Sequence, residues 1–468
     1  MSGTDPRPEA GEIQPDELYG VSGGQVADLR AALDAHDLVR VEEMALALHT
    51  ADLADLIEGL APSERRILID ILGPRVDPEL LTFLAEPVRE EVVGYLGPAD
   101  VAAAVTEMDT DDALDVVASL DQPVQAEVLE QLEAADRAAL EEALAHPEDS
   151  AGRLMQREFV AVPARWTVGE TIDYLREEAE RGAEHLPEEF LDLFVVDDGG
   201  KPLGMVSLSR ILRTRRPVRL QDLMDTDIDR IPVTTDQEEV AHLFRQYDLA
   251  SAPVVDAEGR MVGVITHDDV MDVVHEEAEE DILGLAGIRQ DSVYDSVLST
   301  SRSRISWLFL SLLGLLCASL VIWLFEDAIE EVVALAVLMP IVAALGGNAG
   351  IQAMTVAVRA LSMKELHRGN ALRILGKEIM VAAVNGLLLA VVVGIVAGLW
   401  FSSVHLGAIL AGSLVINLLA AGAVGVIIPF TLSRFSVDPA IASSPFLITV
   451  TDTVGFAAFL GSATYFLL

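Results

Sequence analysis

One carboxylate lies inside an apolar stretch close to the C-terminus of this 468-residue chain. Asp452 falls in PFLITVTDTVG (445–455), where Thr449, Thr451 and Thr453 place hydroxyl groups near it. A carboxylate at the middle of a membrane costs about 2.5–3.5 kcal/mol on insertion scales, so such groups usually face a cavity or an ion path. We therefore expect Asp452 to lie on an ion path. The alternative is a protonated carboxyl that bonds to a neighbouring helix.

A second apolar stretch carries glycines and amides in LGGNAGIQ (345–352). Gly346 and Gly347 permit either close packing of two helices or a local break that exposes backbone carbonyls. Asn348 and Gln352 are four residues apart and therefore share one face of a helix. Packing of small residues alone explains the glycines, but it explains the two amides less well.

Carboxylates crowd a single predicted helix, HDDVMDVVHEEAEEDILGL (267–285). Like charges three or four residues apart destabilise a helix, and hard oxygen ligands at this density suit Mg²⁺ or Ca²⁺. A solvated acidic face is the usual explanation of such a run. The run leads directly toward the first long apolar stretch, however, and this position favours metal binding. The acids are Asp268, Asp269, Asp272, Glu276, Glu277, Glu279, Glu280 and Asp281.

An internal repeat occupies the middle of the chain. VVDDGGKPLGMVS (195–207) matches VVDAEGRMVGVIT (254–266) at an offset of 59 residues. Each copy has an apolar strand, a tight turn and a second strand, and a helix-like stretch (168–175 or 237–247) precedes each copy. The pattern predicts two β-α-β-β-α units. They resemble a tandem pair of CBS modules, a regulatory fold that often binds adenosine nucleotides.

The ribose signature of CBS modules, Gly-x-x-Thr/Ser-x-x-Asp, is intact in the second copy as Gly263, Thr266 and Asp269. In the first copy Arg210 replaces the aspartate. The resemblance therefore implies a nucleotide such as ATP in the second copy. Alternatively, the modules bind no nucleotide and only transmit conformation, because a fold alone does not establish a ligand.

The segment before the repeat, residues 25–150, is predicted to be helical because its apolar residues recur every three or four positions. LGP occurs at 72–74 and again at 96–98, which suggests a superhelix of short helical hairpins. Turn-like AP, EP and QP pairs end at Pro62, Pro87 and Pro123. Residues 1–24 have no basic segment followed by an apolar one, so we interpret them as a disordered lead-in and not as a signal peptide.

Charge divides the chain into two halves. Residues 1–304 hold 67 Asp and Glu against 25 Lys and Arg, and residues 305–468 hold 8 against 6, within a net charge of −44. An acidic soluble half thus precedes an apolar membrane half, and such a surface repels nucleic acid and attracts cations. The single cysteine, Cys317, allows no intrachain disulfide and no cysteine-based metal site. Without a P-loop, nucleophile elbow or HExxH motif, an enzyme is not expected.

Five apolar runs are long enough to cross a hydrocarbon core of about 30 Å. They are 305–325, 332–358, 379–401, 406–432 and 445–468. The second and fourth connecting loops carry the basic residues, which the positive-inside rule makes cytoplasmic. The 304 residues before the first run are then cytoplasmic, and the C-terminus faces outward. Asn385 and Asn417, in the third and fourth runs, are expected to form hydrogen bonds between helices.

The order of these parts resembles the MgtE family of magnesium channels over nearly the whole chain. The most specific segments of the membrane half are PIVAALGGNAGIQ (340–352), VRAL (358–361), VDPA (437–440) and PFLITVTDTVG (445–455). TDQEEVAHL, PVVDAEGR and HDDVMDVVHEEAEEDI carry the resemblance in the soluble half. The chain departs from the family pattern at Ile351, Ala353 and Ser444, where polar Asn, Ser and Asn are usual.

The resemblance implies a homodimer whose pore runs along the two-fold axis and is lined by the second and fifth spans. Two copies of Asp452 would face each other there, which favours a divalent over a monovalent ion. Mg²⁺ sheds water reluctantly, so a ring of carboxylates and carbonyls that reads the hydrated ion is physically reasonable. The pore residues are Asp452, Asn348, Gln352, Gly346 and Gly347, with Asp438 near the cytoplasmic mouth.

The resemblance also implies a magnesium sensor in the soluble half, whose bound Mg²⁺ holds the pore closed. At low Mg²⁺ the carboxylates repel one another, and at high Mg²⁺ the ions neutralise them. A change from 1:99 to 99:1 needs about 5.5 kcal/mol of differential binding, so several weak sites acting together are expected. The matching acids are Asp111, Asp115, Asp236, Glu238, Asp248, Asp269, Asp272, Glu277, Glu280 and Asp281.

We therefore expect a multidomain protein of the cytoplasmic membrane that takes up Mg²⁺ and is closed by cytosolic Mg²⁺. The expected partners are Mg²⁺, a second copy of the chain, membrane lipid and ATP at the CBS pair, and no nucleic acid. The alternatives are a transporter of Mn²⁺ or Co²⁺ and a nucleotide-sensing membrane scaffold that transports nothing. The expected parts are a lead-in (1–24), an α-helical superhelix (25–150), two α/β CBS modules (151–217 and 218–275), an acidic connecting helix (276–304) and a five-helix transmembrane domain (305–468).

Overall fold

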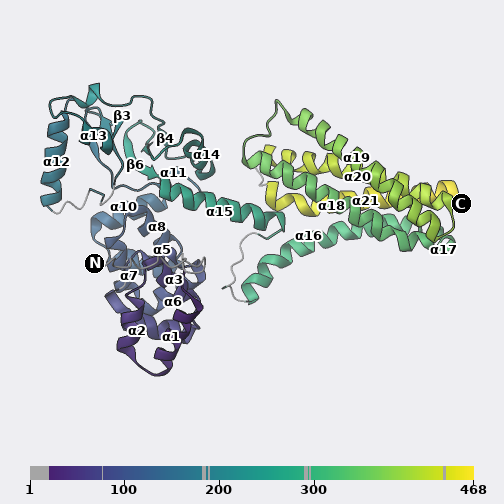
Figure 1. Cartoon of the computed structure of the whole chain (residues 1–468), viewed down its shortest axis with the longest axis horizontal. Helices are drawn as coiled ribbons and strands as arrows, with labels where there is room; N and C mark the ends of the chain where they lie inside the picture. The colour runs from purple at the N-terminus through teal and green to yellow at the C-terminus, as the bar shows by residue number, and fades with distance from the viewer. Residues whose placement is uncertain are drawn as a thin grey trace, which may run out of the picture. The chain divides into compact units, whose positions relative to one another are not determined.

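The computed structural model describes residues 20–75, 77–181, 186–187, 190–288, 294, 297–435 and 439–468. The chain divides into two compact units, Met1–Val274 and His275–Leu468 (Figure 1). The first unit contains short helices and two small sheets, and the second contains the long apolar helices.

Short helices open the first unit, as the periodicity of the sequence predicts. Proline stands in the first turn of α4, α6, α7 and α9, where its missing N–H needs no partner. Pro62, Pro87 and Pro123, which the sequence marks as turns, therefore begin helices. The helices are α1 (Gly23–Asp34), α2 (Leu38–Ala45), α3 (Thr50–Glu58), α4 (Pro62–Leu72), α5 (Leu80–Phe83), α6 (Glu86–Leu96), α7 (Pro98–Glu107), α8 (Thr110–Ala118), α9 (Gln122–Gln131) and α10 (Ala134–Leu144).

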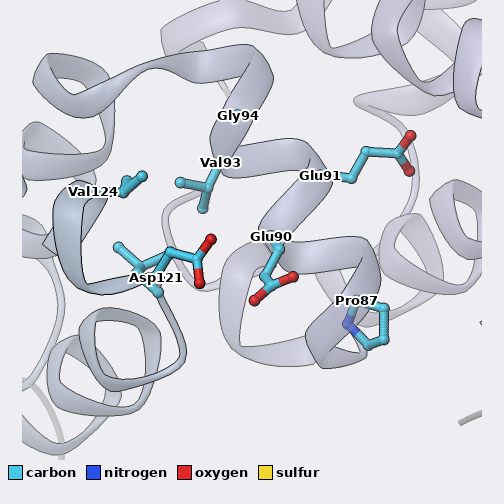
Figure 2. Close-up of a pocket in the computed structure, with 8 residues that line it drawn as sticks. Pro87, Glu90, Glu91, Val93, Gly94, Asp121 and Val124 are labelled. Carbon is cyan, nitrogen blue, oxygen red and sulfur yellow. The ribbon is translucent and has the colours of Figure 1, made fainter. Parts of the chain in front are cut away.

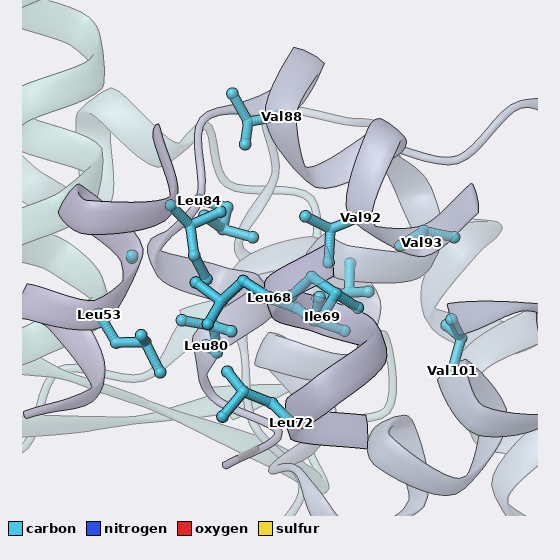
Figure 3. Close-up of a cluster of buried hydrophobic side chains, with 14 of the residues drawn as sticks. Leu53, Leu68, Ile69, Leu72, Leu80, Leu84, Val88, Val92, Val93 and Val101 are labelled. Atoms are coloured by element: carbon cyan, nitrogen blue, oxygen red, sulfur yellow. The ribbon is translucent and has the colours of Figure 1, made fainter. Parts of the chain in front are cut away.

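The apolar faces of these helices meet in a common core (Figure 3). Leu68 of α4 is fully buried in it, together with Leu53, Leu80 and Val92 from three other helices. Ile67, its neighbour in the chain, is 45 % exposed. Adjacent residues of the same helix thus have opposite environments.

This contrast predicts a difference in stability between two matched variants. Leu68→Ala is expected to lower the free energy of unfolding by about 2–5 kcal/mol, because it removes buried methyl groups and leaves a cavity. Ile67→Ala is expected to change it by about 0.5 kcal/mol or less, since that site is on the surface. Calorimetry of the detergent-solubilised chain would measure both, and equal effects would contradict the assigned core.

Two three-stranded sheets follow and repeat one topology, which confirms the predicted β-α-β-β-α units. In each sheet the first two strands are parallel, the last two are antiparallel, and a bulge follows Val195 or Val254. The first sheet has β1 (Ala161–Pro163), β2 (Asp192–Val196) and β3 (Pro202–Ser207), with helices α12 (Val168–Glu180) and α13 (Leu208–Arg213). The second has β4 (Ile231–Pro232), β5 (Ser251–Val255) and β6 (Met261–Thr266), with α14 (Gln237–Tyr247) and α15 (His267–Leu285); α11 (Ala151–Leu154) precedes both.

A buried hydrogen bond joins the two copies. Ser251 Oγ, at the start of β5, donates to Asp192 Oδ2, at the equivalent start of β2, over 2.9 Å. A buried carboxylate is costly unless it is hydrogen-bonded, so this bond favours one arrangement of the two sheets.

Helix α15 covers the acidic run His267–Leu285, so it begins nine residues before the acidic connecting helix expected over residues 276–304 and ends well before residue 304. Residues 297–304, expected to belong to that connecting helix, form the first turns of α16. Residues 289–293 and 295–296 lie outside the described residues. The second unit then has α16 (Val297–Leu324), α17 (Glu326–Glu331), α18 (Ala334–Ser362), α19 (Ala371–Trp400), α20 (Val404–Arg434) and α21 (Pro439–Leu467).

Five helices of the described residues are long and apolar enough to cross a membrane: α16, α18, α19, α20 and the part of α21 from Ser444 to Leu467. They overlap the five predicted runs, although α16 and α19 begin eight residues earlier than predicted. Helix α20 packs against α18, α19 and α21, and α16 packs against α21 (Figure 1). Small residues permit these contacts, since a Cβ on Gly425 of α20 would lie 2.8 Å from Ala353 Cβ of α18.

Candidate functional site

Asp452 lies on α21 and is 9 % exposed within the single chain. Thr449 and Thr451, expected to offer it hydroxyls, donate to carbonyls of their own helix, Pro445 O at 2.7 Å and Leu447 O at 3.1 Å. In the part of the chain that the structure describes, no hydrogen bond reaches Asp452 from a neighbouring helix. The described residues thus offer no hydrogen bond that would hold Asp452, as a protonated carboxyl, against another helix.

Helix α18 runs without interruption over the predicted glycine–amide segment, so the alternative of a local break is wrong. Gly346 is buried at a close helix contact, whereas a Cβ on Gly347 would meet nothing within 4 Å. Asn348 and Gln352 are both exposed, one helical turn apart. Close packing thus explains one glycine, and the two amides form an outward-facing row.

The exposed row continues along α18. Thr355 and Arg359 follow Asn348 and Gln352 at the spacing of one helix face, and both are exposed. Thr355 Oγ1 donates to Ile351 O of its own helix at 2.9 Å, but lipid cannot satisfy the hydrogen bonds of the two amides. This face of α18 is therefore suited to water or to another polypeptide.

Asn417, an amide of α20, lies close to both predicted ion-binding segments. A Cβ on Gly346 would lie 2.1 Å from Asn417 Nδ2, and a Cβ on Gly455 would lie 2.6 Å from the same atom. Gly346 stands two residues before Asn348, and Gly455 stands three residues after Asp452. Asp438, predicted near the cytoplasmic mouth, lies outside the described residues.

The end of α15 that belongs to the second unit contacts the membrane helices. Leu285 packs with Met354 and Val358 of α18 and with Leu447 of α21. Ser362 Oγ, at the end of α18, donates to Asp281 Oδ2 over 2.9 Å. Asp281, predicted as a metal ligand, is thus bonded to a membrane helix.

In the first unit the structure brings two predicted metal ligands together, Asp111 of α8 and Asp269 of α15. Burial raises the pKa of Asp111 well above its usual range, and the charge of Asp269 and a hydrogen bond with it raise that pKa further. Asp112, which the sequence did not single out, has its pKa raised to about 7, first by burial and then by Asp269. Negative charge is unfavourable at this place unless a cation compensates it.

Three other predicted ligands of the first unit have local structural roles. Asp115 forms an ion pair with the buried guanidinium of Arg89. Asp236 caps α14 and accepts from Glu238 N at 3.0 Å. Asp248 ends α14 in the left-handed region, at φ +51°.

Asp272, Glu277 and Glu280 lie along α15, as predicted. Across the described ranges, no three His, Cys, Asp or Glu side chains converge closely enough to hold a metal ion.

The second CBS copy has the ribose signature in place. Thr266 N and Oγ1 donate to Asp269 Oδ2 at 3.0 and 2.6 Å. A Cβ on Gly263 would lie 2.6 Å from Met155 Sδ, so the close approach requires glycine. In the first copy, Ser207 instead pairs with Ser209 at 3.2 Å, and Arg210 is exposed. Asp269 is therefore both the candidate ribose acid and the neighbour of Asp111.

A separate cavity of about 350 Å³ lies beside α6 and the start of α9 (Figure 2). Its carboxylate Glu91 is already engaged, because it pairs with Arg65 and accepts from Tyr95 Oη at 2.6 Å. None of the predicted site residues lines this cavity, so it is not part of the candidate site. Its lining residues are Pro87, Glu90, Glu91, Val93, Gly94, Leu120, Asp121 and Val124.

Models of known protein families match segments of both units. Residues 339–462 match the MgtE family model, a divalent cation transporter, and residues 48–149 match the MgtE intracellular N domain. Residues 151–216 and 220–276 each match the CBS domain. The magnesium transporter MgtE of Bacillus subtilis is 30 % identical over 446 residues, which is 95 % of each chain. The chain belongs to the MgtE family.

Other MgtE proteins are similarly related. The magnesium transporter MgtE of Thermus thermophilus is 33 % identical over 93 % of this chain and 97 % of its own length. The crystal structure of the cytosolic domain of the Mg²⁺ channel MgtE in complex with ATP is 31 % identical, with a TM-score of 0.49, over 53 % of this chain and 99 % of that domain. The predicted fold class, a helical N-terminal domain, a CBS pair and five membrane helices, is confirmed. MgtE is a family of transporters and not a class of enzymes.

Proposed function

We propose that this MgtE protein conducts Mg²⁺ into the cell and closes when cytosolic Mg²⁺ rises. The observation that carries the proposal is the polar row of α18, in which Asn348 and Gln352 face outward from an apolar span. Amides in contact with lipid would lose their hydrogen bonds. A water-filled pore between two copies of the chain removes that loss, so we propose a homodimer with α18 and α21 at the pore.

The chemistry of the ligands supports magnesium as the ion. Asp452, Asn348 and Gln352 offer oxygen atoms, which Mg²⁺ prefers, and the pore set contains none of the His or Cys ligands that softer metals favour. A transporter of Mn²⁺ or Co²⁺ is the second candidate. A scaffold that transports nothing is the third, and it alone makes Asp452 dispensable.

The acidic residues support regulation by cytosolic Mg²⁺. Asp111 is buried beside Asp269, and burial together with the charge of Asp269 raises its pKa. A divalent cation between the two carboxylates would offset both effects. The far end of the same acidic helix, α15, contacts α18 through Asp281 and Leu285. We infer that Mg²⁺, by neutralising these acids, favours the state in which α15 holds α18 and the pore is closed.

The distribution of basic residues supports the topology. Lys364, Arg368 and Arg373 lie between or near the adjoining ends of α18 and α19, and Arg434 ends α20. We place these ends in the cytoplasm, together with the 304 residues before the first span, and the C-terminus outside.

Uptake of radioactive Mg²⁺ into proteoliposomes tests the proposal. The uptake is measured while the concentration of unlabelled Mg²⁺ is varied on the membrane face that carries the first unit. Uptake that falls as this Mg²⁺ rises supports both the channel and the sensor. Uptake that does not change with this Mg²⁺ concentration supports the proposed pore and contradicts the proposed closure by cytosolic Mg²⁺. No uptake, in vesicles where the Thermus thermophilus relative is active, favours the scaffold.

We also propose that ATP binds the second CBS copy, with its ribose at Thr266 and Asp269. Thr266→Val is then expected to raise the Kd for ATP about tenfold, because it removes a hydroxyl worth about 1–3 kcal/mol to a buried polar ligand. Ser207→Ala, at the equivalent position of the first copy, is the matched control and is expected to change nothing. Calorimetric titration of the whole chain with ATP measures both, and unchanged affinity in Thr266→Val would remove this assignment.

A further inference from the structure

Asn417 lies at the junction of three membrane helices. It belongs to α20, is 0 % exposed, and donates from Nδ2 to Val342 O of α18 over 2.9 Å. Glycines of α18 and α21, Gly346 and Gly455, make room for its side chain, since a Cβ on either would lie 2.1 or 2.6 Å from Nδ2. The amide therefore fills the place where these two helices approach α20.

A second hydrogen bond links α20 to α21 one turn away. Ser413 Oγ, four residues before Asn417, donates to Ala458 O of α21 at 3.2 Å as well as to Ile409 O of its own helix at 2.8 Å. Helix α20 is thus hydrogen-bonded both to the helix that carries Asn348 and to the helix that carries Asp452.

Stability alone does not account for an amide at this place. Asn417 Oδ1 is buried and has no partner among the described residues. An unsatisfied buried acceptor is unfavourable, whereas a leucine, which has the same branched skeleton with larger terminal groups, leaves no polar group unpaired. Hydrogen bonds between membrane helices are weak on average, so the single bond to Val342 does not outweigh the unpaired oxygen. The bond therefore matters for where it holds α18.

We propose that Asn417 is a positioning residue of the ion pathway. Its bond to Val342 holds the segment that leads to Asn348 at a set distance from the turn of α21 that carries Asp452. Because a helix is stiff over two turns, a shift at Val342 is transmitted to Asn348. The inference rests on the proposed function where transport is the readout, and one readout below is independent of transport.

Asn417→Leu in the full chain is the first test. We expect it to fold, to take up Mg²⁺ about tenfold more slowly, and to change its ratio of Mg²⁺ to Ca²⁺ uptake, because displacement of a site by about 1 Å has effects of this size or larger. Asn385→Leu is the matched control, since this amide of α19 is exposed and in a membrane helix. Parent-like rates and ion ratios in Asn417→Leu would overturn the proposal.

A double variant separates positioning from packing. Asn417→Ala with Gly455→Ala refills part of the space without restoring a hydrogen bond. Positioning predicts that this chain keeps the altered ion ratio, and recovery of the parent ratio would show that packing alone matters and would overturn the proposal.

Hydrogen–deuterium exchange over residues 342–350 gives the readout that does not depend on transport. We expect faster exchange in Asn417→Leu than in Asn385→Leu, because α18 loses its anchor. If the parent chain transports no Mg²⁺, the proposed function fails, but faster exchange still supports the role of Asn417 in holding α18. Equal exchange in the two variants would overturn that role.

Discussion

Asp452→Ala and Asp452→Asn are both expected to abolish Mg²⁺ uptake. Asparagine keeps the size of the side chain and removes its charge, so the pair separates charge from shape. Two unit charges 4 Å apart attract by about 4 kcal/mol at an effective dielectric constant of 20, and a divalent ion doubles this figure. Even half of the smaller value corresponds to more than about tenfold in occupancy, since 1.4 kcal/mol is tenfold. The loss is measured as uptake into proteoliposomes. The Mg²⁺ concentration is kept low on the membrane face that carries the first unit, because the pore is expected to be open under that condition.

Asp327→Asn is the control for this pair. Asp327 is exposed on α17, a short helix between two spans, and its neutralisation changes the net charge of the membrane unit by the same amount. It is expected to leave uptake close to that of the parent chain. Normal uptake in both Asp452 variants would make the pore assignment wrong and favour the scaffold that transports nothing.

The features that the sequence predicted correctly depend on local patterns. The carboxylate run from His267 to Leu285 forms a single helix, α15, as its pattern predicts. The offset between the two repeats places equivalent residues at equivalent strand positions, as the bond between Asp192 and Ser251 demonstrates. Four-residue spacing correctly placed Asn348 and Gln352 on one face of α18. Periodicity and repetition specify such features without knowledge of the packing.

The features that the sequence missed depend on which helices meet. The partner of Asn417 lies 75 residues away and that of Asp281 lies 81 residues away, so no local pattern identifies either one. Hydroxyl groups were expected around Asp452, but Thr449 and Thr451 bond to their own helix, as threonines in apolar surroundings often do.

One missed contact had a signal in the sequence. Arg65 pairs with Glu91, and Arg89 pairs with Asp115, in each case 26 residues later. The two arginines are themselves 24 residues apart, which is the period of the LGP repeat. Reading the charges at that period would have predicted the pairing of Asp115, a proposed sensor acid, with a buried arginine.

Joint neutralisation of Glu277, Glu280 and Asp281 is expected to raise the Mg²⁺ concentration that half-closes the channel about tenfold or more. The variant Glu277→Gln, Glu280→Gln, Asp281→Asn removes carboxylates that we propose Mg²⁺ neutralises, and hydrogen bonds to charged groups contribute about 1.5–3 kcal/mol each. It also weakens the bond from Ser362 to Asp281, which holds α15 against α18. Uptake titrated with Mg²⁺ on the side of the first unit gives the midpoint.

The matched control for this variant neutralises three acids of α12 instead. Glu177, Glu178 and Glu180 lie on a helix of the first CBS copy, and two of them pair only with Arg181 of the same helix segment among the ion pairs of the described residues. Their neutralisation removes the same charge from the chain and is expected to leave the midpoint unchanged. An equal shift in both triple variants would mean that closure by Mg²⁺ depends on the total charge of the chain and not on α15. An unshifted midpoint in the α15 variant would show that this helix is not part of the sensor.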